Sequence, residues 1–292
     1  MSSTENKTIL FVNKLFNKIE DYWESETFQK ISAEFLIFTF IISLVFIEIR
    51  NLGWISWDII PGNLFMAINL SFSLLLYFEV ISLVFSLVKS VSSSMETQLQ
   101  ILSLIFLRDA FKVFGHISDV YTWKLIEQKL LFIFADSLGA LIIFIIIIFI
   151  RKYDLHKSIC KSIDLQKSFI VIKKTLALIL LITFISLILL DIAYFFANKE
   201  LFNFFHVFFT ILIFNDILLV LITLRYSNSY RIIFRNFGYA LATILMRVAI
   251  ELDHIHNVIL GISSAVFVLL FVLTYNNIPL PKKKYINTRL EN

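Results

Sequence analysis

The sequence predicts an all-α, polytopic helical membrane protein with about eight transmembrane helices, arranged as two tandem four-helix repeats. Of its 292 residues, 59% are hydrophobic and only 16% are charged, whereas soluble domains are about half apolar and about a quarter charged. The apolar residues form long runs without the period-2 alternation of a membrane β-barrel. Ionisable residues also recur at matching places in the two halves of the chain.

The N-terminal residues 1–33 mix apolar and charged positions. Apolar side chains recur there at helical spacing, at Ile9, Val12, Leu15, Phe16, Ile19 and Trp23. This pattern is typical of an amphipathic helix lying on the membrane surface. Binding of a partner protein is the alternative. The first strongly apolar run begins behind this segment and has no small-residue cleavage site, so we expect no cleavable signal peptide.

Eight apolar segments follow, and a spanning helix needs about 20 such residues. We place the segments at 34–50, 63–88, 97–114, 130–150, 174–195, 203–224, 232–252 and 257–275. A basic connector, 151–173, separates the first repeat, 34–150, from the second repeat, 174–275, and a basic tail, 276–292, follows.

The distribution of lysine and arginine predicts the orientation. With eight spans and a cytoplasmic N-terminus, most basic residues fall inside the cell, as membrane proteins prefer. Outside the cell lie only Arg50, Lys112, Lys124, Lys129 and Lys199. We therefore predict a multi-pass protein of the cell membrane with both termini in the cytoplasm. The connector and the tail could also attract anionic lipid headgroups.

The two halves align as a tandem duplication. The alignment matches Glu79 with Asp216 and Arg108 with Arg247. It rests on three pairs of segments: FIISLVFIEI (40–49) with TFISLILLDI (183–192), FEVISLVFSLVK (78–89) with NDILLVLITLR (215–225), and LSLIFLRDAFK (102–112) with LATILMRVAIE (241–251). A parallel repeat of this kind predicts a pseudo-two-fold axis along the membrane normal.

A family resemblance follows from these residues. In the second half, LRYSNSYRIIFRNFGYALATILMRVAIELDHIHNVILG contains an arginine followed by an acid and a histidine: Arg247, Asp253 and His254. In the first half, Phe78 and Glu79 form an aromatic–acid pair ahead of a polar turn. Both features resemble the phosphate-starvation-inducible PsiE family of four-helix membrane proteins. The chain departs from the family pattern at Asn215 and Asp109. The resemblance implies a fold more than a function.

The matched charges Glu79, Arg108, Asp216 and Arg247 are the main candidate site residues. An unpaired charge at the bilayer centre costs on the order of 3 kcal/mol, so we expect each acid to pair with the arginine of the next helix. One interpretation is a polar path or proton relay between the halves. The other is a pair of buried ion pairs that hold the helices in register. Asp136, in the fourth span, has no counterpart.

A second cluster lies at the outer end of the seventh span and comprises Asp253, His254 and His256. Zinc would need further ligands, for which His206, Glu251 or His116 are candidates. A polar interfacial turn and a pH-sensitive rim are the alternatives. The single cysteine, Cys160, excludes an intramolecular disulfide and a cysteine-based metal cluster.

Two functions of different class remain open. The first is a channel or secondary carrier for an ion or small solute. The second is a non-transporting membrane scaffold or stress-response accessory protein of PsiE-like type. We expect no enzyme, because no Walker, GxSxG or HExxH motif is present. We also expect no cofactor and no nucleic-acid partner, whereas the bilayer is a partner and an oligomer is compatible with the sequence.

Overall fold

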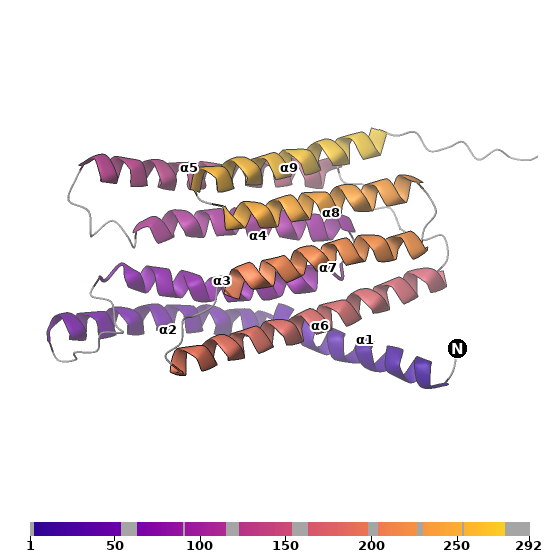
Figure 1. The fold of residues 1–292 in the computed structure, drawn as a ribbon, viewed down its shortest axis with the longest axis horizontal. Coiled ribbons are helices and arrows are strands. Elements are labelled where there is room, and N and C mark those ends of the chain that lie inside the picture. Colours follow the sequence, from indigo (N-terminus) through magenta and orange to yellow (C-terminus); the bar gives the residue numbers. More distant parts are fainter. Residues whose placement is uncertain are drawn as a thin grey trace, which may run out of the picture.

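The computed structural model describes residues 3–53, 63–89, 91–114, 123–153, 163–197, 204–226, 230–252 and 254–277. These residues form nine α-helices and no strand (Figure 1). The helices are α1 (Ser3–Glu24), α2 (Glu26–Asn51), α3 (Met66–Ser86), α4 (Val91–Phe114), α5 (Trp123–Tyr153), α6 (Ile163–Phe196), α7 (Phe204–Tyr226), α8 (Tyr230–Glu251) and α9 (His254–Asn277). Each of the eight predicted apolar segments therefore contributes one long helix, although α2, α4, α5 and α6 begin earlier than expected, and α6 begins within the predicted connector 151–173.

Helices α2–α9 alternate in direction and run side by side (Figure 1). Helices α3, α5, α7 and α9 all end, and α4, α6 and α8 all begin, at the same end of the bundle (Figure 1). We call this the basic end, because Lys89, Arg151, Lys152, Lys174 and Arg225 lie there. The alternating direction agrees with the grouping of basic loops that the sequence predicted.

Seven of the described helices are long and apolar enough to cross a membrane: α2, α3 and α5–α9. The protein is therefore an integral membrane protein by helix length and composition. Helix α4 is long enough but too polar to meet the same criterion. Its side chains are nevertheless well covered, since between residues 93 and 113 only Leu104, Leu107, Phe111 and Lys112 are exposed.

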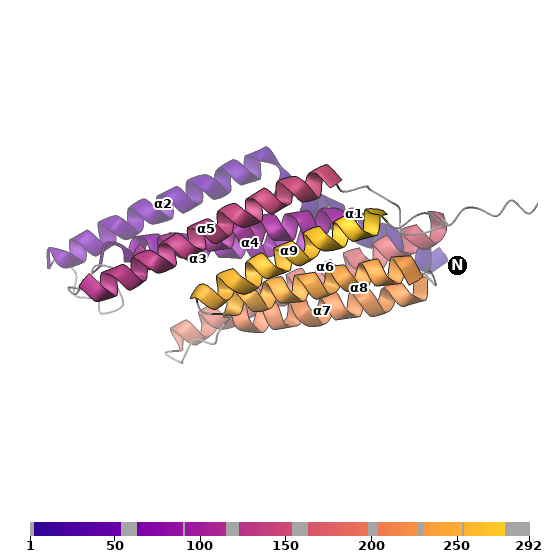
Figure 2. The same cartoon turned by 90° about the horizontal axis from the view of Figure 1, so that it is seen from above.

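The two halves pack side by side with their helices in the same order (Figures 1 and 2). Helix α5 packs on α9 and α4 packs on α8. Helix α3 packs on α6, but the pair that a two-fold axis would exchange with it, α7 and α2, does not pack closely in the described part of the chain. The packing therefore differs from the expected pseudo-two-fold arrangement.

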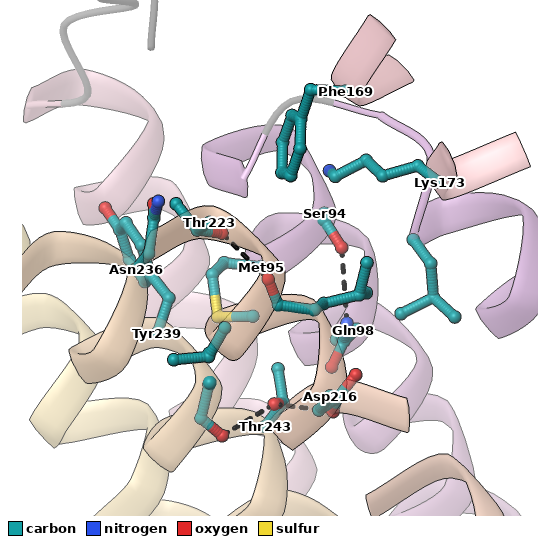
Figure 3. A pocket seen from close by; sticks show the side chains of 14 residues that line it. Ser94, Met95, Gln98, Phe169, Lys173, Asp216, Thr223, Asn236, Tyr239 and Thr243 are labelled. Carbon is teal, nitrogen blue, oxygen red and sulfur yellow. Dashed lines mark hydrogen bonds between the residues drawn. The ribbon is translucent and has the colours of Figure 1, made fainter. Parts of the chain in front are cut away.

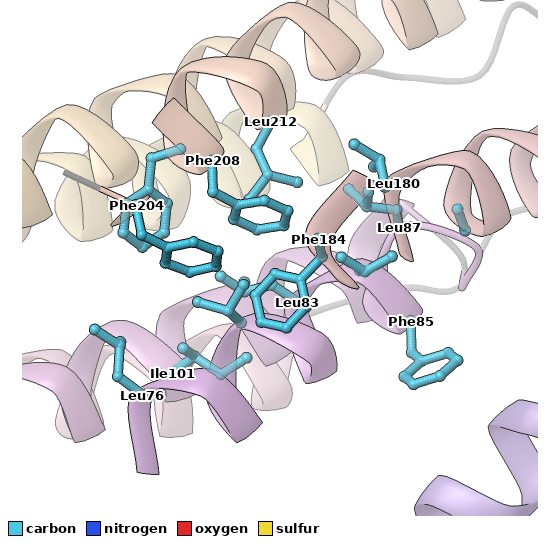
Figure 4. Close-up of a cluster of buried hydrophobic side chains, with 14 of the residues drawn as sticks. Leu76, Leu83, Phe85, Leu87, Ile101, Leu180, Phe184, Phe204, Phe208 and Leu212 are labelled. Carbon is cyan, nitrogen blue, oxygen red and sulfur yellow. The ribbon is translucent and has the colours of Figure 1, made fainter. Parts of the chain in front are cut away.

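Two apolar clusters join the halves. The first is formed by α1, α3, α4, α6 and α7, and in it Phe184 packs on Phe204 and Phe208 with ring centroids 5.3 and 5.0 Å apart (Figure 4). The second lies between α4, α5, α8 and α9. Inside it Phe106 packs against Gly139 of α5 and Gly261 of α9; a Cβ atom at Gly261 would collide with its ring, and a Cβ atom at Gly139 would collide with Val258 and crowd the ring at 3.1 Å. These glycines thus allow close helix approach and do not break their helices.

Helix α1 packs against α6 and α2, so it does not lie alone on the membrane surface. Phe16 is fully buried and its ring contacts Phe85 at the end of α3. The indole nitrogen of Trp23 donates a 3.1 Å hydrogen bond to Ser82. Lys174 donates a 2.6 Å hydrogen bond to Asn17. The apolar stripe predicted from the sequence is therefore buried partly against this protein's own helices.

Candidate functional site

The second half contains the predicted acid–arginine pair. Asp216 of α7 forms an ion pair with Arg247 of α8, and the two side chains are only 5% and 2% exposed. The hydroxyl of Thr243, one turn before Arg247, donates a 2.8 Å hydrogen bond to the same carboxylate. Two donors from α8 thus compensate one buried carboxylate on α7, which is the condition for a stable buried charge.

The first half departs from the prediction. Arg108 donates 3.2 and 2.8 Å hydrogen bonds from Nε and Nη2 to Asp109, its neighbour in the sequence, and not to Glu79. Both carboxyl oxygens of Glu79 are buried without a hydrogen-bond partner among the described residues. The expected pairing across this helical hairpin is therefore wrong. The reason is local competition: Asp109 can reach the guanidinium from the same helix.

Asp136 of α5 adds a further buried acid to the first half. It is 1% exposed, and neither carboxyl oxygen has a hydrogen-bond partner in the described part of the chain. Asp109 acts electrostatically on both Glu79 and Asp136. The first half therefore holds three neighbouring acids and one arginine, whereas its counterpart holds a closed ion pair.

A cavity of about 70 Å³, lined by both apolar and polar side chains, reaches Asp216 (Figure 3). Its walls come from α4, α6, α7 and α8, with Leu87 following α3, so both halves contribute. Leu87 belongs to the first apolar cluster, and Met95 and Tyr239 belong to the second. The cavity thus lies where the two clusters meet, and it has room for a few water molecules.

The polar lining of the cavity comes from every wall. Ser94 and Gln98 of α4 are hydrogen-bonded to each other at 3.2 Å. Lys173 of α6 is buried and donates a 2.9 Å hydrogen bond to the backbone carbonyl of Lys89. Asn236 of α8 is 5% exposed, and neither its amide oxygen nor its amide nitrogen has a hydrogen-bond partner among the described residues.

The cavity therefore contains an ammonium group, amides and hydroxyls close to the buried Asp216–Arg247 pair. Lys173 and Phe169 lie at one side of the site, and Asp216 and Thr243 lie at the other (Figure 3). Such groups can replace the hydration shell of a small polar species inside a membrane protein. Asp216 lines the cavity on the side opposite Lys173, so one member of the predicted charge pair borders this space (Figure 3).

The predicted histidine cluster lies largely outside the described residues. Asp253, His116 and the side chain of His254 lie outside the described part of the structure, and His256 is exposed on α9. Nδ1 of His206 lies 3.1 Å from Glu251 and links the start of α7 to the end of α8. Among the described residues, no group of three or more His, Cys, Asp or Glu side chains is arranged to hold a metal ion.

Sequence reasoning missed most of the cavity. Lys173, Asn236, Gln98 and Thr243 were not predicted as site residues. Their one available signal was polarity, because Gln98, Asn236 and Thr243 stand inside the predicted apolar segments. Lys173 was counted as part of the basic connector, whose role was to set the orientation.

We compared the chain with models of known protein families, with curated proteins and with solved structures, and found no match to any of them. The resemblance to the PsiE family therefore stays a prediction.

Proposed function

We propose that this integral membrane protein is a channel or secondary carrier for an ion or small solute. The observation that carries the proposal is the cavity between α4, α6, α7 and α8, which holds several polar side chains and reaches Asp216 of the buried Asp216–Arg247 pair. Polar and charged groups inside a membrane bundle are expensive and usually mark a solute or ion pathway. A cavity walled by both halves also suits a site whose access changes when the halves move.

In this proposal α4 is the eighth transmembrane helix. Its exposed side chains Leu104, Leu107 and Phe111 lie on one helical stripe that faces lipid, whereas Gln98 and Arg108 point into the protein. An inward-facing polar surface lets a helix of modest hydropathy cross the bilayer. The basic end is then cytoplasmic in the cell membrane, together with both termini.

The tandem duplication is part of the same proposal. Helix order and direction are the same in α2–α5 and in α6–α9 (Figure 1). Arg108 and Arg247 stand equally far from the first residues of α4 and α8. The halves differ in their charges: the second half has the closed Asp216–Arg247 pair, and the first half has two acids, Glu79 and Asp136, without a hydrogen-bond partner among the described residues.

A non-transporting scaffold of PsiE-like type is the second candidate. It is favoured by one observation: Oδ2 of Asp216 is engaged by both Arg247 and Thr243, as in a pair that only holds helices together. The scaffold function gives no role to the amide of Asn236, which has no hydrogen-bond partner in the described part of the chain.

The test fills the cavity without changing a charge. Ala240 lines the cavity on α8, and Ala240→Leu adds three carbon atoms to this confined space. Ala193→Leu is the matched control, because Ala193 is exposed on α6. Purified wild-type and variant proteins are reconstituted into liposomes, and the flux of protons, inorganic cations and inorganic anions is recorded.

We expect flux in the wild type and in Ala193→Leu, and loss of flux in a folded Ala240→Leu protein. Equal flux in Ala240→Leu and the wild type would place any pathway elsewhere. Absence of flux of every probe from the wild type would favour the scaffold.

A further inference from the structure

We infer that the cavity is a binding site for a small monovalent anion, entered from the basic end. This inference rests on the proposed function and assigns its substrate class. Its starting point is the charge of the walls. Among the described lining residues, Lys173 and Asp216 are the two that carry charge. Since Arg247 and Thr243 already compensate Asp216, the positive charge of Lys173 is left in excess.

Lys173 is held in place without being neutralised. Among the described residues its one hydrogen bond runs to a backbone carbonyl, at 2.9 Å, which leaves two ammonium hydrogens without a described acceptor. Asp216 acts on it electrostatically, but no carboxylate in the described part of the chain lies within ion-pair distance of it. A buried ammonium with an open neighbouring space favours an anionic partner, because burial without one is costly.

Asn236 supplies an independent observation. Its side chain lines the same cavity, is 5% exposed and has no hydrogen-bond partner among the described residues. Native proteins rarely leave a buried amide unsatisfied, so a ligand or water is expected beside it. The amide N–H groups are donors to an anion, and the hydroxyls of Thr223 and Ser94 line the same space.

The volume of the cavity and the charges around it limit the size and the charge of the anion. A cavity of about 70 Å³ holds a few water-sized groups, which suits chloride, nitrate or formate and excludes large organic anions. Two basic side chains near the basic end are each engaged by an acid, Lys89 by Glu24 and Arg151 by Glu96. One excess positive charge therefore calls for one negative charge on the ligand.

The test measures binding in detergent and therefore does not require transport. Thermal unfolding of the delipidated protein is followed while sodium gluconate is replaced by sodium chloride, nitrate or formate at constant ionic strength. The variant is Lys173→Gln, and the matched control is the adjacent Lys174→Gln, whose lysine bonds Asn17 outside the cavity. A short-chain phosphatidylglycerol is titrated separately, to distinguish a lipid phosphate from a free anion.

We expect a saturable rise in melting temperature with a small anion for the wild type and for Lys174→Gln. Half-saturation should require about tenfold more anion, or more, in Lys173→Gln, since a charged hydrogen bond is lost. No rise beyond that in gluconate, an equal response of Lys173→Gln, or a rise with phosphatidylglycerol alone would overturn the inference. Flux of a cation in the liposome assay without anion binding would overturn this inference and leave the proposed function standing. Anion binding without flux of any probe would leave this inference standing and overturn the proposed function.

Discussion

Replacing Asp216 by asparagine should lower the free energy of unfolding by about 3–5 kcal/mol, the usual effect of removing one partner from a buried ion pair. The side chain of Arg247 is 2% exposed and would remain buried without a counter-charge. Thr243 would also lose the carboxylate to which it donates. The cavity beside Asp216 admits water, so we expect the lower part of this range.

Glu79→Gln is the matched change in the first half and should behave differently. Neither carboxyl oxygen of Glu79 has a hydrogen-bond partner in the described residues, and Arg108 is already engaged by Asp109. Exchange of an unpartnered acid for an amide of the same shape should change the free energy of unfolding by less than about 1 kcal/mol. The two carboxyl-to-amide changes should thus differ by about 2 kcal/mol or more.

The assay is reversible unfolding in mixed micelles with increasing sodium dodecyl sulfate, followed by circular dichroism. Asp216→Asn/Arg247→Met removes both charges and should recover much of the stability lost in Asp216→Asn, because no buried charge is left unpaired. Equal losses in Asp216→Asn and Glu79→Gln would refute the reasoning. So would a double variant that is less stable than the single one.

Three further predictions concern the packing. Gly261→Ala would place a Cβ atom 2.3 Å from the ring of Phe106, so the same titration should show a loss of about 1–3 kcal/mol; unchanged stability would contradict the close approach of α9. Phe16→Ala should release α1 and speed its removal by protease, whereas Phe11→Ala, at a 65% exposed position, should not. Burial, and after it the charge of a neighbouring glutamate, raises the pKa of Glu20. The ionised form therefore disfavours docking of α1, and protection from protease should decline as the pH rises through this raised pKa. Glu20→Gln should remove that decline. If protease protection of this variant still declined with pH as in the wild type, Glu20 would not be the cause of the decline.

The sequence alone predicted where the helices lie. Long apolar runs are set by the thickness of the bilayer, so the eight segments between residues 34 and 275 correspond to α2–α9. Helical periodicity likewise predicted α1. The Asp216–Arg247 pair was predictable because an isolated charge in the bundle is unstable and each of these residues was the nearest available partner of the other.

Only the tertiary structure decided which groups meet. Arg108 has two acids within reach, and the choice of Asp109 over Glu79 depends on side-chain geometry that periodicity does not report. The cavity unites Gln98, Lys173 and Asn236 from three helices far apart in the sequence. The order of the two halves, with α5 beside α9, depends on complementary surfaces such as Phe106 between two glycines. Hydropathy determines which parts of the sequence form long apolar helices. Which helices become neighbours depends on the shape and polarity of helix faces that meet only after folding.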